Sequence, residues 1–357
     1  MWTQSEDQDF SGDNRGWPKG KSRKWDKGTE KRIKDIFYSL VNDPTEFYHG
    51  ATAIEQEWRR RYPSDSSPSL RTIGRILFDL GLSKKRKRDR HKGAARYLCY
   101  PEHTIYETLG KRLLEADFIG KKYLKGHTKP LNFIAFSFKK EPKLRYFKRI
   151  EGQTAGNFIK QCGHFFKKFE KPDLAKVDNA LTMIGSASGK RNVSRVMEFL
   201  LRHQVIPIFA VPRKPFSQAS IEGNNSVFAR KFWNRIEFKN IREIDEKLEL
   251  FNQSSIKYTR YKRPNKKPTE KKNFLPKIYF IRQVREDKKR KRRGYIDILN
   301  EKIFLSQNYI NYFVLGEWNL KKEEILIHFE KEQKLNLVKK RSFKINKRSK
   351  KRISDFI

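Results

Sequence analysis

The sequence contains little cysteine and no long apolar run. Its two cysteines, Cys99 and Cys162, offer neither a disulfide framework nor zinc-site spacing, so we expect free thiols in a reducing compartment. No run of about 18 apolar residues occurs, which argues against a membrane span, and no signal-peptide pattern is found at the start. These absences exclude disulfide-rich secreted domains and membrane proteins, and we expect a cytoplasmic protein.

Acidic residues are also scarce relative to basic ones. The 357 residues include 82 Lys and Arg but 41 Asp and Glu, so the formal net charge is 82 − 41 = +41. Aromatic residues make up 13% of the chain, which is too many for a disordered polymer. A folded chain of this length and charge predicts two or three domains and a polyanionic partner. A ribosomal or membrane-surface protein would share this charge balance.

Acidic residues in the central part of the chain follow predicted strands. Asp178 and Asn179 come directly after a short apolar strand pattern, and VIPIFAV at 205–211 is typical of a second buried strand. The loop at 212–220 then leads to Glu222 near the start of a helix. Strand ends can bring such acids together, and neighbouring carboxylates repel unless a cation lies between them. We therefore expect a metal site here.

A third acid lies upstream. The alternation of apolar and polar residues in LLEADFIG at 113–120 predicts a strand that carries Asp117. Two more strand patterns follow at 131–138 and 143–150, and then a helix at about 154–169. The expected order is three strands, helix, strand, helix, strand and helix.

The pattern resembles the catalytic core of the retroviral-integrase-like DDE transposases of bacterial insertion sequences. The resemblance rests on Asp117, on the pair Asp178–Asn179, and on Glu222 preceded by Pro215 and Ala219. It extends over roughly residues 30 to 330.

Two features depart from the family pattern. Ala219 stands where the family usually has glycine, and Asp178 and Glu222 are 222 − 178 = 44 residues apart, more than is common in the family. We place the additional residues in LTMIGSASGKR at 181–191. This departure bears on the loop geometry more than on the chemistry.

The resemblance implies an α/β RNase H-like catalytic core that performs phosphoryl transfer at DNA. Asp117, Asp178 and Glu222 would be both the catalytic residues and the ligands of two Mg²⁺ ions, with Mn²⁺ as a substitute. No covalent protein intermediate and no other cofactor is needed. The implied partners are double-stranded DNA, as element ends and target, and further copies of the chain on that DNA. The implied location is the bacterial nucleoid in the cytoplasm.

The pattern of residues 29–98 predicts an all-α helix-turn-helix domain followed by a basic linker. Thr29 and Ser69 are the expected N-caps of its first and third helices. The third helix would place Arg71, Thr72 and Arg75 in the major groove of DNA. A generic three-helix bundle with a solvated face is the alternative. The expected core positions of that helix are Leu70, Ile73, Ile76, Leu77 and Leu80.

The remaining boundaries follow changes in composition. We expect a flexible basic arm at 1–28, the catalytic core at 99–260, a linker and small closed β-barrel at 261–338, and a disordered basic tail at 339–357. Four more basic residues are candidate DNA contacts, although a solvated face or loop fits them equally well. They are Lys190, Arg191, Arg230 and Lys231.

Other functions fit parts of the pattern. A non-catalytic DNA-binding protein on a degenerate core would keep the charge and lose the chemistry, and a nuclease would cleave DNA without joining it. An RNA-binding protein would be expected to show the aromatic stacking motifs of a four-stranded sheet, which we do not find. Dependence on a divalent ion distinguishes these functions better than salt sensitivity does.

Overall fold

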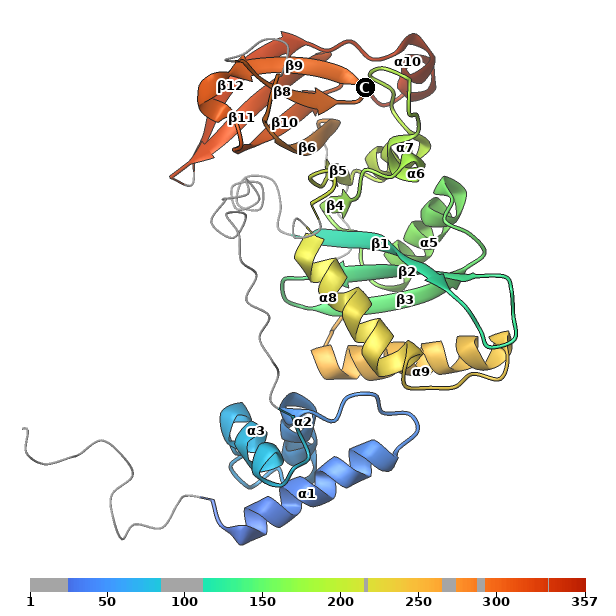
Figure 1. The fold of residues 1–357 in the computed structure, drawn as a ribbon, viewed down its shortest axis with the longest axis vertical. Coiled ribbons are helices and arrows are strands. Elements are labelled where there is room, and N and C mark those ends of the chain that lie inside the picture. Colours follow the sequence, from blue (N-terminus) through green and yellow to red (C-terminus); the bar gives the residue numbers. More distant parts are fainter. Residues whose placement is uncertain (1–24, 85–111, 215–217, 265–273, 288–292, 333) are drawn as a thin grey trace, which may run out of the picture. The chain divides into compact units, whose positions relative to one another are not determined.

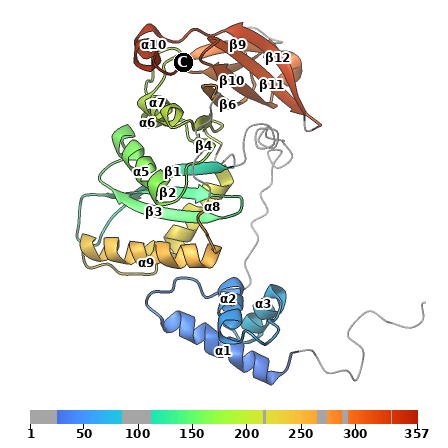
Figure 2. The same cartoon turned by 180° about the vertical axis from the view of Figure 1, so that it is seen from behind.

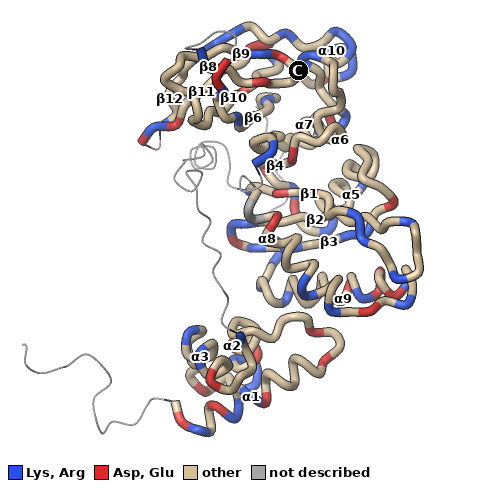
Figure 3. Tube along the Cα trace, in the orientation of Figure 1, with Lys and Arg blue, Asp and Glu red and all other residues tan. Residues whose placement is uncertain are grey.

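The computed structural model describes residues 25–84, 112–214, 218–264, 274–287, 293–332 and 334–357. They form two compact units, and the short segment Pro44–Tyr48 belongs to the second unit although the first unit surrounds it in sequence. Lys and Arg occur throughout both units (Figure 3). None of the helices in the described ranges combines the length and hydrophobicity that a membrane crossing requires. Most of the expected arm, most of the basic linker, Cys99 and Pro215 lie outside the described residues, and the last two residues of the expected arm, 27–28, begin α1.

The first unit is a three-helix bundle, as the sequence predicts. Asp26 rather than Thr29 caps the first helix, because its carboxylate accepts a hydrogen bond from the Thr29 N–H at 2.9 Å. Ser69 caps the third helix as expected, through a 3.1 Å bond from the Thr72 N–H. The helices are α1 (Lys27–Asn42), α2 (Ala51–Arg61) and α3 (Leu70–Asp79).

The predicted core face of α3 is correct in its middle and wrong at its ends. Ile73, Ile76 and Leu77 are buried, whereas Leu70 and Leu80 are exposed. Leu80 follows the last residue of the helix, and Leu70 is its first residue. The bundle therefore covers the middle of α3 and leaves both of its ends exposed.

The second unit is built on a mixed β-sheet, and the predicted order of its elements is confirmed with one added helical turn. The first three strands pair in an antiparallel manner. The fourth strand runs parallel to the first, and the fifth runs parallel to the fourth. Its elements are β1 (Leu113–Lys122), β2 (Leu131–Phe138), β3 (Leu144–Ile150), α5 (Ala155–Lys168), β4 (Leu174–Val177), α6 (Leu181–Ile184), α7 (Arg195–Arg202), β5 (Ile206–Phe209), α8 (Ala219–Phe228), the π-helical η3 (Ala229–Trp233) and α9 (Ile241–Thr259).

Side chains of β2 alternate between the two faces of this sheet, and both sets are buried under helices. Phe136 stacks on Phe165 of α5 with ring centroids 4.7 Å apart. Phe133, on the opposite face, packs against Phe228 of α8 at 5.1 Å. Accordingly α8 lies in front of the strands in Figure 1, and α5 lies in front of them in the reverse view of Figure 2. The sheet is therefore covered by helices on both sides.

The C-terminal strands are present, but the strand pairing does not match the small closed barrel that we expected. Four of them extend the first sheet to the order β12-β11-β10-β6-β5-β4-β1-β2-β3, and the other three form a separate sheet. These elements are β6 (Lys277–Gln283), β7 (Arg285–Glu286), β8 (Arg293–Ile298), β9 (Glu301–Ser306), the short 3-10 helix η4 (Gln307–Tyr309), β10 (Phe313–Asn319), β11 (Glu324–Lys331), β12 (Lys334–Ser342) and α10 (Lys347–Ile353).

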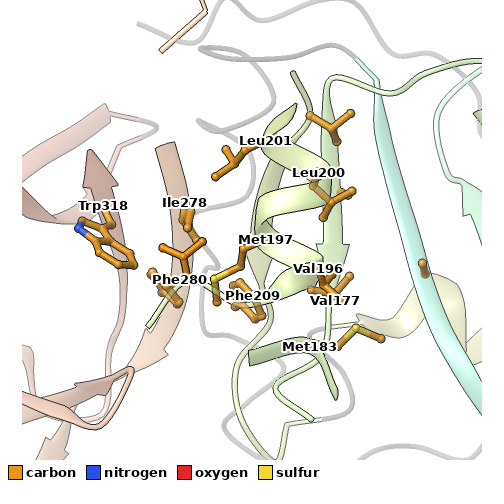
Figure 4. Packing of buried hydrophobic residues seen from close by; sticks show 14 of the residues in the cluster. Val177, Met183, Val196, Met197, Leu200, Leu201, Phe209, Ile278, Phe280 and Trp318 are labelled. Atoms are coloured by element: carbon orange, nitrogen blue, oxygen red, sulfur yellow. The ribbon is translucent and has the colours of Figure 1, made fainter. Parts of the chain in front are cut away.

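The reason for this difference is the composition of β6. Five consecutive residues, 278–282, are buried, so the strand has no solvent face and pairs on both edges. It runs parallel to β5 on one edge and antiparallel to β10 on the other. Phe209 of β5 stacks on Phe280 with centroids 5.3 Å apart, and the apolar core continues to Trp318 (Figure 4). The central α/β region and the C-terminal strands thus share one hydrophobic core.

The expected disordered tail is also folded. Its first residues belong to β12, and 347–353 form the helix α10, in which Ile353 is fully buried. The tail contains many Lys and Arg residues and few apolar ones, so its sequence favoured disorder although those few apolar residues anchor it.

Candidate active site

Strand register brings two of the predicted acids together. β1 and β4 run parallel, with Glu115 opposite Lys176 in the last pair of the ladder. Continuing each strand by two residues reaches Asp117 and Asp178. Asp117 pairs with Ala135 of β2, so its side chain lies on the face that α8 covers. The carboxyl end of this sheet therefore carries two neighbouring carboxylates.

The surroundings of Asp117 disfavour its charge. Burial and then the negative charge of Asp178 raise the pKa of the Asp117 carboxyl to about 6, and Glu222 adds a smaller effect of the same sign. A hydrogen bond opposes the rise, because Asn225 Nδ2 donates to Asp117 Oδ2 at 3.1 Å. Burial also raises the pKa of Asp178, against a 3.1 Å bond from the Ala180 N–H to Asp178 Oδ1.

Glu222 lies in the first turn of α8 and its side chain is exposed. Asn225 follows it by three residues on the same helix and reaches Asp117 directly. Within the described ranges, no three Asp, Glu, His or Cys residues are close enough to hold a metal ion together. The structure thus brings Asp117 and Asp178 together, while Glu222 acts on Asp117 through its charge.

The paired carboxylates fit a hydrated divalent cation. The raised pKa of each reflects a cost of ionisation that a bound cation would relieve. Mg²⁺ commonly binds through one or two carboxylates and keeps several waters, so Asp117 and Asp178 suffice as its protein ligands. Glu222, as placed, does not complete a three-carboxylate site.

A buried arginine fixes the turn after Asp178. Arg282 of β6 donates from Nη2 to Asn179 Oδ1 at 2.8 Å and from Nη1 to the Ala210 carbonyl at 3.1 Å. Asn179 Nδ2 also donates to that carbonyl, at 2.5 Å. Burial lowers the pKa of Arg282 to about 9. Local patterns in the sequence do not assign Arg282 to the site; its only signal there is a single cation inside the apolar run IYFIRQV at 278–284.

A pocket of about 380 Å³, the acidic pocket, opens beside Asp178. Arg213 and Lys214 line it together with Asp178 and Asn179. Gln218 lines it too, and its buried Nε2 has no hydrogen-bond partner among the described residues. A phosphate group entering this pocket would meet basic side chains and a carboxylate. Local patterns in the sequence do not single out Arg213, Lys214 or Gln218, because 212–220 is typical of a connecting loop.

Two of the predicted DNA contacts are engaged inside the protein. Arg191 forms an ion pair with Glu301, with Nε and Oε1 3.4 Å apart. Lys231 donates to the Phe47 carbonyl at 3.2 Å and lies over the Tyr48 ring. The π-helical segment η3 changes the helical phase after α8, so the spacing from Glu222 did not predict this orientation.

The other predicted contacts differ in exposure. Lys190 and Arg230 are exposed, although Arg230 Nε donates to the Ser226 carbonyl at 3.3 Å. On α3, Arg71 and Arg75 are exposed. Thr72 is half-buried, and its hydroxyl lies 3.0 Å from Ser69 Oγ in the N-cap.

No protein-family model matches the sequence, and no curated protein matches it. Among solved structures, the chain is similar to one in the cryo-EM structure of the simian T-cell lymphotropic virus intasome with PP2A regulatory subunit B56 gamma. Identity is 10%, the match covers 86% of this chain and 95% of that chain, and the TM-score is 0.34. It is also similar to the HTLV-2 integrase catalytic core domain in complex with magnesium, at 11% identity over 40% of this chain and 85% of that one, with a TM-score of 0.28.

Proposed function

We propose that the protein is a DDE-type DNA transposase or integrase, a polynucleotidyl transferase that cleaves DNA ends and joins them to target DNA. The observation that supports this most directly is the meeting of Asp117 and Asp178 at the ends of adjacent parallel strands. Burial, together with the charge of Asp178 and to a smaller extent that of Glu222, raises the pKa of Asp117 to about 6. Such clustered carboxylates with shifted pKa values are typical of sites that carry a divalent ion.

Asp117 and Asp178 would hold Mg²⁺, or Mn²⁺ in its place, with Glu222 as the third catalytic carboxylate. When bound, a pair of such ions supplies the Lewis acidity that activates a water or a DNA 3′-hydroxyl and stabilises the leaving oxygen. Asn225 orients the Asp117 carboxylate through its hydrogen bond. Asn179 and Arg282 hold the turn that carries Asp178. Arg213 and Lys214 would bind phosphate oxygens in the acidic pocket.

The proposed partner is double-stranded DNA. The net charge of +41 supplies non-specific attraction to phosphates. Arg71 and Arg75 on the exposed side of α3 would read bases, and Lys190 would contact the backbone. Joining two DNA ends in concert requires more than one copy of the chain. The proposed location is the nucleoid, in the cytoplasm of a bacterium.

A second candidate is a non-catalytic DNA-binding protein on the same core. The observation that favours it is the exposed position of Glu222, together with the lack of a three-carboxylate metal site among the described residues. A repressor or architectural factor would keep the basic surface and need no metal.

Strand transfer separates the two candidates. The protein is mixed with target plasmid and a labelled duplex that carries the element's own end, in Mg²⁺, in Mn²⁺ and in chelator. We expect metal-dependent joined product that disappears in Asp178→Asn and persists in Glu246→Gln, a matched loss of charge at an exposed position of α9. Tight binding without cleavage in either metal would favour the non-catalytic candidate.

A further inference from the structure

A second pocket, of about 600 Å³, lies where α5, α6 and α7 meet the C-terminal helix α10. Three arginines line it: Arg195 at the start of α7, and Arg348 and Arg352 on α10. We call it the arginine pocket. The sequence analysis drew attention to none of these three residues, and none belongs to the acidic pocket.

The charge of this pocket is of one sign. Its lining contains the three guanidinium groups and no carboxylate. Arg352 is held in place, since Nη2 donates to the Val193 carbonyl at 2.5 Å and Nε lies 3.3 Å from Glu198 Oε2. Within the described ranges, neither Arg195 nor Arg348 forms an ion pair with a carboxylate. Guanidinium groups match the oxygens of a phosphate in a bidentate manner, so this lining fits a phosphate group.

Helix ends at the pocket wall add to the same preference. α5 begins at Ala155, and its cap Thr154 satisfies the Asn157 N–H at 3.2 Å. α7 begins at Arg195, and its cap Ser194 satisfies the Met197 N–H at 3.1 Å. Other amides of the first turn have no partner within their helix, and the helix dipole favours an anion there. These helix ends reinforce the arginines.

The pocket exists because the C-terminal helix is fixed to the segment after Asp178. The Val193 N–H donates to Ser349 Oγ at 3.1 Å, and the Asn346 N–H donates to the Arg191 carbonyl at 3.1 Å. Ile353, the last residue of α10, is fully buried and anchors the helix. The residues that lengthen the interval between Asp178 and Glu222 therefore form one wall, and α10, a basic segment in Figure 3, forms another.

The two pockets lie along one continuous stretch of chain. Asp178 and Ala180 line the acidic pocket, and Leu181 and Ser186 line the arginine pocket. We propose that the arginine pocket binds a backbone phosphate of the DNA whose neighbouring phosphate reacts at Asp178. This inference rests on the proposed function for its ligand, since it names DNA as the source of the phosphate.

Salt dependence tests the number of phosphate contacts without requiring chemistry. Binding of the full chain to a duplex of arbitrary sequence is measured in chelator over a range of KCl concentrations. In the variant carrying both Arg195→Gln and Arg348→Gln, we expect the slope of log K against log [salt] to become less negative by about 1, as for one lost phosphate. Arg348→Lys keeps the charge and should retain most of the slope.

The matched control removes the same number of charges from α10, the helix that carries Arg348, at positions outside the pocket. Lys347 and Lys351 are exposed on α10 and do not line the pocket. Their double substitution by Gln should change the slope by clearly less than the arginine pair does. An equal change would overturn the proposal, because general charge rather than a site would then explain it. Unchanged melting temperatures exclude misfolding of the variants.

Hydrogen exchange distinguishes DNA from a free anion. We expect the duplex to protect peptides covering 181–195 and 345–353 in the wild type but not in the arginine double variant. Inorganic phosphate, the free-anion probe, should protect them far less. Protection by phosphate and none by the duplex would overturn the DNA assignment. Protection by DNA without strand transfer would refute the proposed function and leave this pocket standing, whereas strand transfer without protection would refute the pocket alone.

Discussion

The acidic pocket and the arginine pocket share a backbone segment but arise in different ways. Beside the acidic pocket, the register of two neighbouring strands brings Asp178, which lines the pocket, close to Asp117. In the arginine pocket, Arg195 meets Arg348 and Arg352 from a helix more than a hundred residues away in the chain. Burial raises the pKa of both carboxyls at the first site, whereas three guanidinium groups line the second. A phosphodiester chain, with several negative charges in a row, is the kind of ligand that can use both.

The largest expected difference between the pockets lies in chemistry. Asp117→Asn or Asp178→Asn should reduce strand transfer to background and leave DNA binding largely intact, because each removes a proposed metal ligand and no proposed phosphate contact. The measurement is product formation in Mg²⁺ alongside binding in chelator. An Asp178→Asn protein that joins DNA at the parental rate would show that Asp178 is not a ligand.

The second expected difference is in how the free energy of unfolding depends on pH. The pKa of Asp117 is raised from 3.8 to about 6 on folding, so its protonated form favours the fold. That stability is present in full below the unfolded value and is lost as pH rises through about 6. Without metal at pH 7.5, Asp117→Asn should therefore be more stable than the wild type by roughly 2–3 kcal/mol.

Chemical unfolding at pH 7.5 and at pH 4 measures this effect. The advantage of Asp117→Asn should shrink towards pH 4, and saturating Mg²⁺ should reduce it at pH 7.5 by stabilising the wild type. An advantage that is the same at both pH values would mean that ionisation of Asp117 is not its cause. Arg348→Gln should show no such dependence on pH.

A third test concerns the residue that links the acidic pocket to the C-terminal strands. Arg282→Met leaves the buried oxygens of Asn179 and Ala210 without this donor, which should lower the free energy of unfolding by roughly 1–3 kcal/mol. It should also lower kcat at temperatures where the protein remains folded, since the turn carrying Asp178 loses a support. Arg285→Met, an exposed position on the adjacent β7, is the control. Full activity of folded Arg282→Met would show that the arginine serves stability alone.

A fourth expected effect concerns DNA recognition outside both pockets. Arg71→Ala and Arg75→Ala should each reduce discrimination for the terminal sequence by roughly 1–3 kcal/mol, as for a lost base contact. Competition between specific and random duplexes measures it, with Lys34→Ala on α1 as a charge-matched control. Equal losses on both duplexes would mean that these arginines contact phosphates only.

Much of the fold followed from local patterns. The alternation in β2, the apolar stripe of α7 and the caps Ser69 and Thr154 all lie within a few residues of the structure they specify. Asp117 and Asp178 could be anticipated for the same reason, since each belongs to a strand whose end is visible in the sequence. Glu222 could be assigned to the start of a helix, but its distance from the other acids could not.

The tertiary structure alone decided which surfaces meet. β6 is apolar on both faces, so its sequence specified a buried strand without specifying β5 as its neighbour, and a separate barrel was an equally consistent interpretation. Arg191, Lys231 and Arg282 carry the same charge as any solvent-exposed basic residue, yet each is bound to an oxygen supplied by a distant segment. Periodicity encodes which side of an element is buried, because that depends on neighbours in sequence. The partner that covers it depends on packing between distant parts of the chain, and this is why the arginine pocket became apparent only in the folded protein.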